Sequence, residues 1–210
     1  RELTAADYVY SWKRILDPRM RANALNAIEG RILDPEGVLA KARQAGQLDL
    51  DAKIEGLQAI DRYTIRMKLN FPDAELLANL TTTAFGAVAR EVIEAYRDGS
   101  GWAMANPVGT GPYRLKEWRR GQKIVLEANP GYREERYPES SDPADKAIMA
   151  KLKGKRVPLV GRVEISIIEE GNPRLLAFRG RELDYVSVPN DLVWNVLEPP
   201  ATLKPALAKE

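Results

Sequence analysis

The side chains that could carry out chemistry are few in this chain, and their types favour binding over catalysis. The 210 residues include no His and no Cys. The commonest general base at neutral pH, the commonest metal ligands and a thiol nucleophile are therefore missing. Ser11 and Ser166 could act as nucleophiles only if a lysine activated them. The sequence predicts no enzyme, no cofactor and no metal site, and a Ser/Lys-type hydrolase is kept as an alternative.

Two adjacent acids, Glu169 and Glu170, resemble the paired carboxylates that acid–base catalysis uses. Neighbouring residues on a strand point to opposite faces of a sheet. The two carboxylates would therefore not converge on one bond of a substrate, and we expect a solvated strand end at this position.

Charge is balanced over the chain, with 32 basic and 30 acidic residues and a formal net charge of +2. Nucleic-acid partners usually require a basic excess on one face, so none is expected. A basic stretch nevertheless makes a nucleic-acid or membrane-surface module the second alternative. It has no interleaved aromatics to stack on bases, and acids lie close to it, so we interpret it as a solvated loop. Its members are Lys146, Lys151, Lys153, Lys155, Arg156 and Arg162.

The first element is a predicted helix that begins after Thr4 and shows apolar residues at helical spacing. Asp7 stands where the carboxylate of a capping box would, and Trp12 lies on the apolar face, in the expected core. Asp17-Pro18 ends the helix, because the residue before a proline disfavours helical angles. Further helices are predicted over residues 22–29, 35–45 (with Gly46 as its cap), 73–80 and 90–97 (ended by Gly99).

Strand patterns appear in both halves of the chain. Tyr63 to Leu69 alternate apolar and polar residues, which predicts a half-buried strand paired with residues 57–60. Residues 112–118 and 123–128 predict a second hairpin. The polar, charged segment from Tyr137 to Lys155 is interpreted as a surface excursion.

The last third of the chain predicts a strand–helix–strand unit with a right-handed crossover. Its parts are a strand over Val163–Ile168 with residues 163, 165 and 167 on one apolar face, a helix from Pro173, and a strand over Leu183–Val188. A final helix is expected over residues 190–197, before the break at Pro199-Pro200.

One short loop is distinctive: Gly109, Thr110, Gly111, Pro112 and Tyr113. Its glycines permit backbone angles closed to other residues, and its proline fixes the exit direction. We interpret it as a rigid structural loop, with direct ligand contact as the alternative. It matches neither a dinucleotide loop nor a Walker loop, because the third Gly and the Gly-Lys-Ser/Thr are both missing.

Four segments of the chain, taken in order, resemble one family of proteins. They are the Thr-Ala-Ala-Asp helix with its closing Asp-Pro (residues 3–18), the hairpin of residues 60–69, the Gly-Thr-Gly-Pro-Tyr loop continuing to Asn129-Pro-Gly-Tyr132, and residues 174–184 with Val188-Pro189. The sequence is similar in these segments to the dipeptide-, oligopeptide- and nickel-binding proteins of ABC importers, family 5 of the bacterial solute-binding proteins. In the fourth segment Phe178 replaces the usual Leu, and Arg181 separates Gly180 from Glu182.

This resemblance implies an α/β chain with a mixed sheet and helices, a fragment of a periplasmic-binding-protein-like type II fold with its extra α+β domain. Residues 1–104 would form part of the extra domain and residues 105–210 the central part of lobe I, with the second lobe absent. The implied function is capture of peptides or a similar polar solute in a cleft between lobes, and delivery to an ABC permease. A periplasmic monomer is implied. No signal peptide is present, and the chain begins at Arg1 directly before a helix, so we expect a piece of a longer protein.

Candidate ligand contacts follow from residue types and positions, and from the family resemblance. Thr81, Thr82, Thr83 and Phe85 follow an apolar helix and offer hydroxyls beside an aromatic ring; a β-prone turn is the alternative. Asn190 and Asp191 follow the carboxyl end of a predicted strand, where open α/β sheets tend to bind ligands; helix capping is the alternative.

The resemblance adds Asn23 and Asn26, which fall where the family's extra domain approaches the cleft. The identity of the ligand and of the permease stays open.

Overall fold

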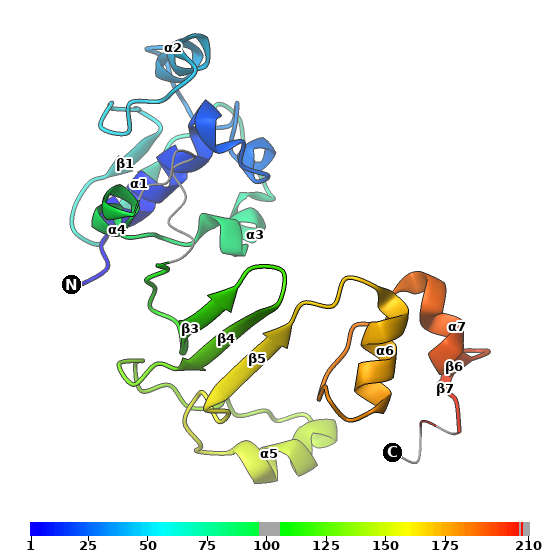
Figure 1. Cartoon of the computed structure of the whole chain (residues 1–210). Coiled ribbons are helices and arrows are strands. Elements are labelled where there is room, and N and C mark those ends of the chain that lie inside the picture. The colour runs from blue at the N-terminus through cyan, green and yellow to red at the C-terminus, as the bar shows by residue number, and fades with distance from the viewer. Residues whose placement is uncertain (97–105, 206, 208–210) are drawn as a thin grey trace. The chain divides into compact units, whose positions relative to one another are not determined.

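The computed structural model describes residues 1–96, 106–205 and 207, and divides the chain into two compact units. Unit 1 comprises residues 1–114 and 128–159, and unit 2 comprises residues 115–127 and 160–210 (Figure 1). The predicted boundary at residues 104 and 105 lies outside the described residues and stays a prediction. In the described part of the chain, every helix is too short or too polar to span a bilayer.

Unit 1 is organised around helix α1 (Ala5–Leu16), which confirms the first predicted helix. The Asp7 carboxylate accepts hydrogen bonds from the Thr4 amide at 2.8 Å and from the Thr4 hydroxyl at 3.0 Å, so the helix start is fixed as predicted. Trp12 is buried in the core, where its ring packs edge-to-face with Tyr8 and Phe85.

The first predicted hairpin is confirmed, although its strands are short. Strands β1 (Leu57–Ala59) and β2 (Ile65–Met67) pair antiparallel, with Leu57 opposite Met67 and Ala59 opposite Ile65. The Asp61 carboxylate accepts the amides of Tyr63 and Thr64 at 2.8 Å and closes the turn between them.

Gly56 lets the β1–β2 hairpin approach the segment at Leu33. A Cβ at Gly56 would lie 2.6 Å from the Leu33 backbone and from the Ile32 side chain. The Gly56 amide donates to the Leu33 carbonyl at 2.8 Å, so no other residue type fits this contact without backbone movement.

The other helical segments of unit 1 are shorter than the sequence predicts. The helix expected over residues 22–29 is only a 3-10 turn, because Asn side chains at 23 and 26 weaken helix propensity within so short a run. Gly46 caps its helix in the left-handed region as predicted, with φ 72. Gly99, the predicted end of another helix, lies outside the described residues. The segments are η1 (Pro18–Met20), η2 (Leu25–Ala27), α2 (Val38–Ala45), α3 (Leu76–Leu80), η3 (Thr83–Phe85) and α4 (Arg90–Ala95).

The hydrophobic core of unit 1 joins α1 to the hairpin and the short helices. Ile28, Ile32, Ile54 and Leu57 are almost completely buried. The carboxylate of Asp17 is also buried, where it accepts hydrogen bonds from Arg19 and from the Leu48 amide. Burial raises the pKa of Asp17, but these donors outweigh it and lower the pKa overall.

Residues 133–157 of unit 1 form an arm whose side chains are mostly exposed, which agrees with the predicted surface excursion, whereas the helix within it corrects the interpretation of the basic stretch as a loop. The arm contains η4 (Pro143–Asp145) and helix α5 (Lys146–Leu152). Asp142 caps the first turn by accepting the Ala144 amide at 2.8 Å, a signal that the charged composition concealed.

Unit 2 contains a three-stranded sheet in the order β3 (Tyr113–Arg119), β4 (Lys123–Ala128), β5 (Arg162–Ser166). This confirms the second predicted hairpin and the strand after it. Strands β4 and β5 pair antiparallel, with Ile124 opposite Ile165. Ile165 is 42% exposed, so the apolar face of this strand is open to solvent at that residue in the described structure.

The predicted crossover unit is only half present. Strand β5 and helix α6 (Gly171–Arg179) form, but Leu183–Val188 has no strand structure. Tyr185 is 84% exposed, and a strand requires a neighbour that pairs with its backbone, which this segment lacks within the described residues. The prediction of a strand–helix–strand unit is therefore wrong.

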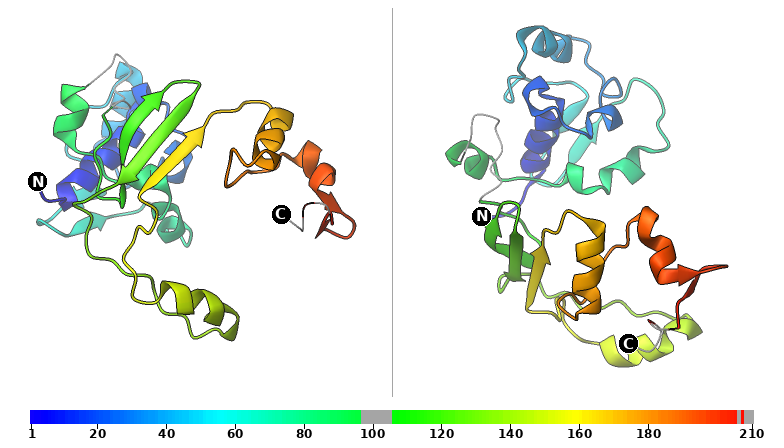
Figure 2. Two further views of the ribbon diagram at one scale, coloured as in Figure 1. Left: turned by 60° about the horizontal axis from the view of Figure 1, so that its bottom comes forward. Right: turned by 45° about the vertical axis from the view of Figure 1, so that its right-hand side comes forward.

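After that segment, η5 (Asn190–Leu192) and α7 (Val193–Val196) confirm the last predicted helix in a shorter form. A small hairpin of β6 (Leu197–Glu198) and β7 (Thr202–Leu203) then surrounds the break at Pro199-Pro200 (Figure 2).

Candidate ligand-binding site

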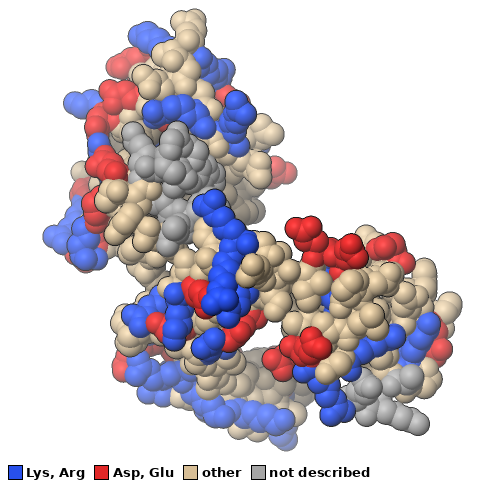
Figure 3. Space-filling model, viewed as in Figure 1, with Lys and Arg blue, Asp and Glu red and all other residues tan. Residues whose placement is uncertain are grey.

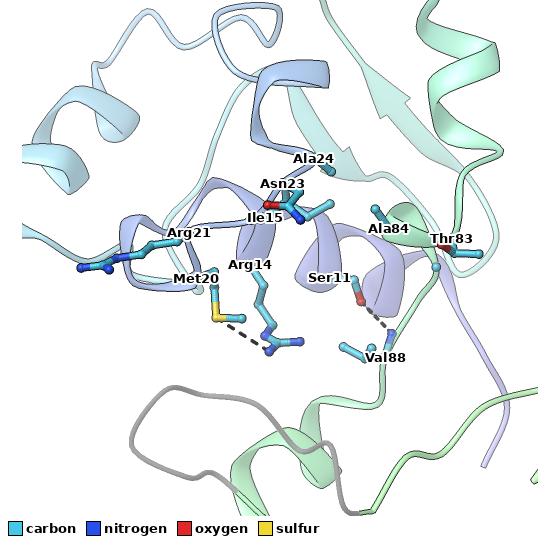
Figure 4. A pocket seen from close by; sticks show the side chains of 12 residues that line it. Ser11, Arg14, Ile15, Met20, Arg21, Asn23, Ala24, Thr83, Ala84 and Val88 are labelled. Atoms are coloured by element: carbon cyan, nitrogen blue, oxygen red, sulfur yellow. Dashed lines mark hydrogen bonds between the residues drawn. The ribbon is translucent and has the colours of Figure 1, made fainter. Parts of the chain in front are cut away.

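A pocket of about 400 Å³ lies in unit 1 between α1 and the segments that flank it. Helix α1 contributes Ser11, Arg14 and Ile15, which lie on one face because residues three and four apart are neighbours on a helix. The chain after α1 contributes residues 20–24, and the segment after α3 contributes Thr83, Ala84, Gly86 and Val88 (Figure 4).

One wall of the pocket is fixed to α1 by Ser11. The buried Ser11 hydroxyl donates to the Asp7 carbonyl at 2.7 Å and accepts the Val88 amide at 2.8 Å. Its hydrogen is therefore engaged with a carbonyl rather than with a base.

The nearest lysine along α1 does not activate Ser11. The Lys13 ammonium donates to the carbonyls of Leu50 at 3.1 Å and Ala52 at 2.6 Å instead. Ser11 is positioned as a structural link, and the geometry gives no support to a Ser/Lys nucleophile at this site.

Arg14 brings a positively charged guanidinium to the pocket, and Met20 brings a flexible apolar thioether. An Arg14 amino group lies 3.9 Å from the Met20 sulfur, and both side chains reach the same side of the pocket (Figure 4). A guanidinium offers several hydrogen-bond donors in a fixed plane, and a thioether adapts to varied apolar shapes. This pair suits a ligand with an acceptor group beside an apolar portion.

The structure brings two of the predicted ligand residues together. Asn23 and Thr83 both line the pocket, although they are 60 positions apart in sequence. Asn26, Thr81 and Thr82 are exposed outside its lining. The Thr81 and Thr82 hydroxyls donate to the carbonyls of Ala78 at 2.7 Å and Asn79 at 2.9 Å, at the end of α3.

Phe85 belongs to the core rather than to the pocket lining. Its side chain is 2% exposed and packs against Trp12, whose indole N–H donates to the Phe85 carbonyl at 2.9 Å. The alternation of exposed Thr83 and buried Phe85 comes from the 3-10 turn η3, whose geometry the sequence did not reveal.

Asn190 and Asp191 lie in unit 2, at the start of η5. Both are exposed. No strand precedes them, so the argument that placed them at a strand end has lost its basis. As ligand residues they stay a prediction.

The Gly109–Tyr113 loop is held by Asn129. The Asn129 side-chain amide donates to the Gly111 carbonyl at 3.1 Å, and its backbone amide donates to the Pro112 carbonyl at 2.8 Å. Neither Gly109 nor Gly111 has a positive φ, and a Cβ at either would meet nothing closer than 4.0 Å. The predicted reason for these glycines, an angle closed to other residues, is therefore wrong in this structure.

Gly109 and Thr110 line a second pocket of about 310 Å³, together with Asp7 and Glu91. Arg1 bridges these two carboxylates, with contacts of 2.5 Å to each. The Arg1 guanidinium lowers the pKa of Asp7 to about 2 and that of Glu91 to about 2. Both acids are thus already paired, and this pocket is a weaker candidate for an added ligand.

Sequence reasoning missed Arg14, Met20 and Val88 as lining residues. The spacing of Ser11 and Arg14 was a usable signal, because residues three apart share a helix face. Val88 lies at the pocket because its amide donates a hydrogen bond to Ser11, 77 positions away, and no local pattern predicts such a contact. Over residues 1–96, 106–205 and 207, no cluster of acidic side chains has the arrangement of a metal site.

Comparison with known proteins places these features in a family. A model of bacterial extracellular solute-binding proteins, family 5 Middle, matches residues 1–206. The periplasmic oligopeptide-binding protein OppA of Salmonella typhimurium is 31% identical over 132 residues, which are 62% of this chain and 23% of OppA. The dipeptide-binding protein DppE of Bacillus subtilis is 26% identical over 93% of this chain and 31% of its own length.

Solved structures show the same fold. The murein tripeptide binding protein MppA of Escherichia coli has a TM-score of 0.65 at 20% identity, over 95% of this chain and 34% of MppA. OppA of Haemophilus influenzae, solved as a complex with RPPGFSPFR, has a TM-score of 0.63 at 20% identity, over 93% of this chain and 33% of that one.

The chain therefore spans between 23% and 34% of the length of these relatives. The predicted α/β class, a part of a periplasmic-binding-protein fold, is confirmed by these structures. With its family model matched from residue 1 to residue 206, this chain belongs to family 5 of the bacterial extracellular solute-binding proteins.

Proposed function

We propose that this chain is part of a peptide-capturing component of an ABC importer that works outside the cytoplasmic membrane. The family match over residues 1–206 carries the proposal. It is supported by relatives named as oligopeptide-, dipeptide- and murein peptide-binding proteins. Delivery to a permease, a periplasmic location and a monomeric state are parts of the same proposal.

The pocket of unit 1 supplies one side of the peptide site in this proposal. Asn23 and Thr83 offer neutral hydrogen-bonding groups, and Arg14 offers charged donors to a carbonyl or carboxylate. Peptides are commonly held by hydrogen bonds to their main chain while pockets accept their side chains. Such capture needs no bond to be made or broken in the ligand, which is consistent with a chain that has no His or Cys.

Closure around the ligand supplies the signal for delivery. A ligand shifts a two-state hinge only by the difference between its affinities for the closed and open states. The residues of unit 1 would add to that difference if the ligand touched them only after closure. The predicted domains (residues 1–104 and 105–210) belong to this proposal as parts of an extra domain and of lobe I.

The test has two parts, and both use purified protein. Mass spectrometry of co-purifying small molecules should find short peptides; recovery of a different solute in every preparation would refute the peptide assignment. Calorimetry should then show that Asn23→Ala and Thr83→Ala each weaken peptide binding about fivefold to tenfold, as expected for one lost hydrogen bond.

Asn26→Ala is the matched control, because Asn26 is an exposed Asn on the same segment outside the pocket lining. Its affinity for peptide should stay within about twofold of the original. Equal losses in all three variants would show that the pocket is not where the peptide binds.

A further inference from the structure

The arm of residues 133–157 has a closed, ordered base. The Tyr137 amide donates to the Lys155 carbonyl at 3.1 Å, and the Val157 amide donates to the Glu135 carbonyl at 2.9 Å. The Arg136 side chain adds a bond to the Gly154 carbonyl at 2.5 Å. The two legs thus hold α5 at the end of a hairpin-like structure (Figure 2).

Charge is separated along this arm. Residues 146–156 contain five basic side chains and no acidic one, whereas the five acids of the arm all lie between residues 134 and 145. Figure 3 shows the result as a band of Lys and Arg along the lower edge of the view, where α5 lies.

The acids of the arm are all used within it. Glu134 pairs with Arg156 at 3.4 Å, and Glu139 pairs with Lys153 at 3.1 Å. Glu135 pairs with Arg133, Asp142 caps η4, and Asp145 accepts the Ser140 hydroxyl. Within the described part of the chain, Lys146, Lys151 and Lys155 have no carboxylate partner.

The exposed side of α5 is suited to a broad, flat surface. Lys146 and Lys151 are exposed on the helix, and the small side chains of Ala147 and Ala150 lie exposed between them. Ile148 is 53% exposed beside these lysines, while Met149 and Leu152 are partly buried. Lysines around an exposed apolar side chain combine attraction to anionic lipids with one group that can enter the headgroup boundary.

We propose that α5 and the lysines beside it bind the anionic headgroup surface of a phospholipid membrane. The lysines are compact, hydrated charges on flexible stems, which match diffuse negative charge better than a bidentate site does. The basic stretch of residues 146–156 contains no aromatic residue that could stack on bases, so nucleic acid fits less well. Such binding would keep the protein near membrane-embedded partners, and it is independent of what the pocket in unit 1 binds.

The test is co-sedimentation of purified protein with phosphatidylcholine vesicles that contain about 30 mol% phosphatidylglycerol, compared with phosphatidylcholine alone, in about 0.1 M salt. We expect binding to the anionic vesicles only. Replacing Lys146, Lys151 and Lys155 together by Gln should lower the partition coefficient about 100-fold, or about fivefold for each lysine. The matching triple Arg variant should keep the binding, because it keeps the charge.

The control removes the same charge elsewhere in the sequence: Lys41, Lys53 and Lys116, all of them exposed and outside residues 133–157, are together replaced by Gln. This variant should bind within about twofold of the original protein. Equal binding to neutral vesicles, an equal loss in the control, or retention on heparin without any vesicle binding would each overturn the proposal. Circular dichroism of the Gln variants verifies that the fold is intact.

Discussion

Phe85→Ala should separate the role of this ring in the core from the role of the neighbouring pocket. The ring is 2% exposed and packs edge-to-face with Trp12 at a centroid distance of 6.1 Å. Removing a buried Phe costs about 3–5 kcal/mol through lost transfer energy and the cavity that remains. Because a domain's stability is about 5–15 kcal/mol, this loss is a large part of the whole.

The assay is urea denaturation followed by far-ultraviolet circular dichroism, with peptide affinity measured separately on protein that is still folded. Phe85→Leu is the control, since it keeps most of the apolar volume and should cost under about 1.5 kcal/mol. Thr83→Ala changes an exposed pocket residue two positions away, and it should alter the free energy of unfolding by less than about 0.5 kcal/mol.

Two results would refute this reasoning. The first is a loss of less than about 1 kcal/mol in Phe85→Ala, which would mean that the ring is not held in a packed core. The second is a folded Phe85→Ala variant that no longer binds peptide while Thr83→Ala binds normally. That outcome would return Phe85 to the set of ligand contacts.

Three further predictions concern stability. Acidification should remove the contribution of Asp7: its pKa is lowered to about 2, so the stabilisation is full above about pH 4 and is lost as the pH falls toward 2. In Asp7→Asn the loss of stability over this pH range should be smaller, with the contribution of Glu91 remaining because its pKa is also lowered to about 2, and an unchanged profile of the urea midpoint would contradict the contribution of Asp7. Gly56→Ala should lower the free energy of unfolding by more than about 2 kcal/mol, because the added Cβ would clash with Leu33. Gly109→Ala is the control: it has open space around it and should change that free energy by no more than about 0.5 kcal/mol. Thermal melting compares the two variants, and equal melting temperatures would contradict the prediction. Asn129→Ala should cost about 1–2 kcal/mol through the lost bond to the Gly111 carbonyl, and amide exchange at Gly131, whose N–H the same side chain accepts, should become faster; unchanged exchange would argue against this role.

Local patterns were sufficient for helix α1 and for the β1–β2 hairpin. Helix α1 follows from its start at Thr4, its apolar spacing and the Pro18 that ends it. The β1–β2 hairpin follows from alternation and from an Asp61 that closes the turn. In both cases the residues that decide the structure are within a few positions of one another.

The errors arose where distant residues decide the outcome. Leu183–Val188 has strand-like composition, but a strand forms only beside a partner, and composition does not supply one. Phe85 looked like a pocket residue because the turn that directs its ring toward Trp12 depends on packing across 73 positions. Helix α5 is a different case, because its signal is local: the Asp142 cap lies within a charged sequence that was not interpreted as helical.

The candidate site was predicted in part. Asn23 and Thr83 meet at one pocket, as two of the eight proposed contacts, whereas Asn190 and Asp191 belong to the other unit. Such convergence depends on tertiary structure. A single sequence therefore suggested polar candidates but not which of them share a cavity.

The two hydrogen bonds of the Ser11 hydroxyl limit how the pocket can adapt to different ligands. Because its hydroxyl joins helix α1 to the backbone at Val88, this side of the pocket cannot widen without breaking a partly buried hydrogen bond. Variation among ligands must then be absorbed by long side chains at the rim, such as Arg14 and Met20, which can change rotamer cheaply. The pocket can therefore accept different ligand chemistry at its rim while the backbone along its α1 side keeps a constant contour.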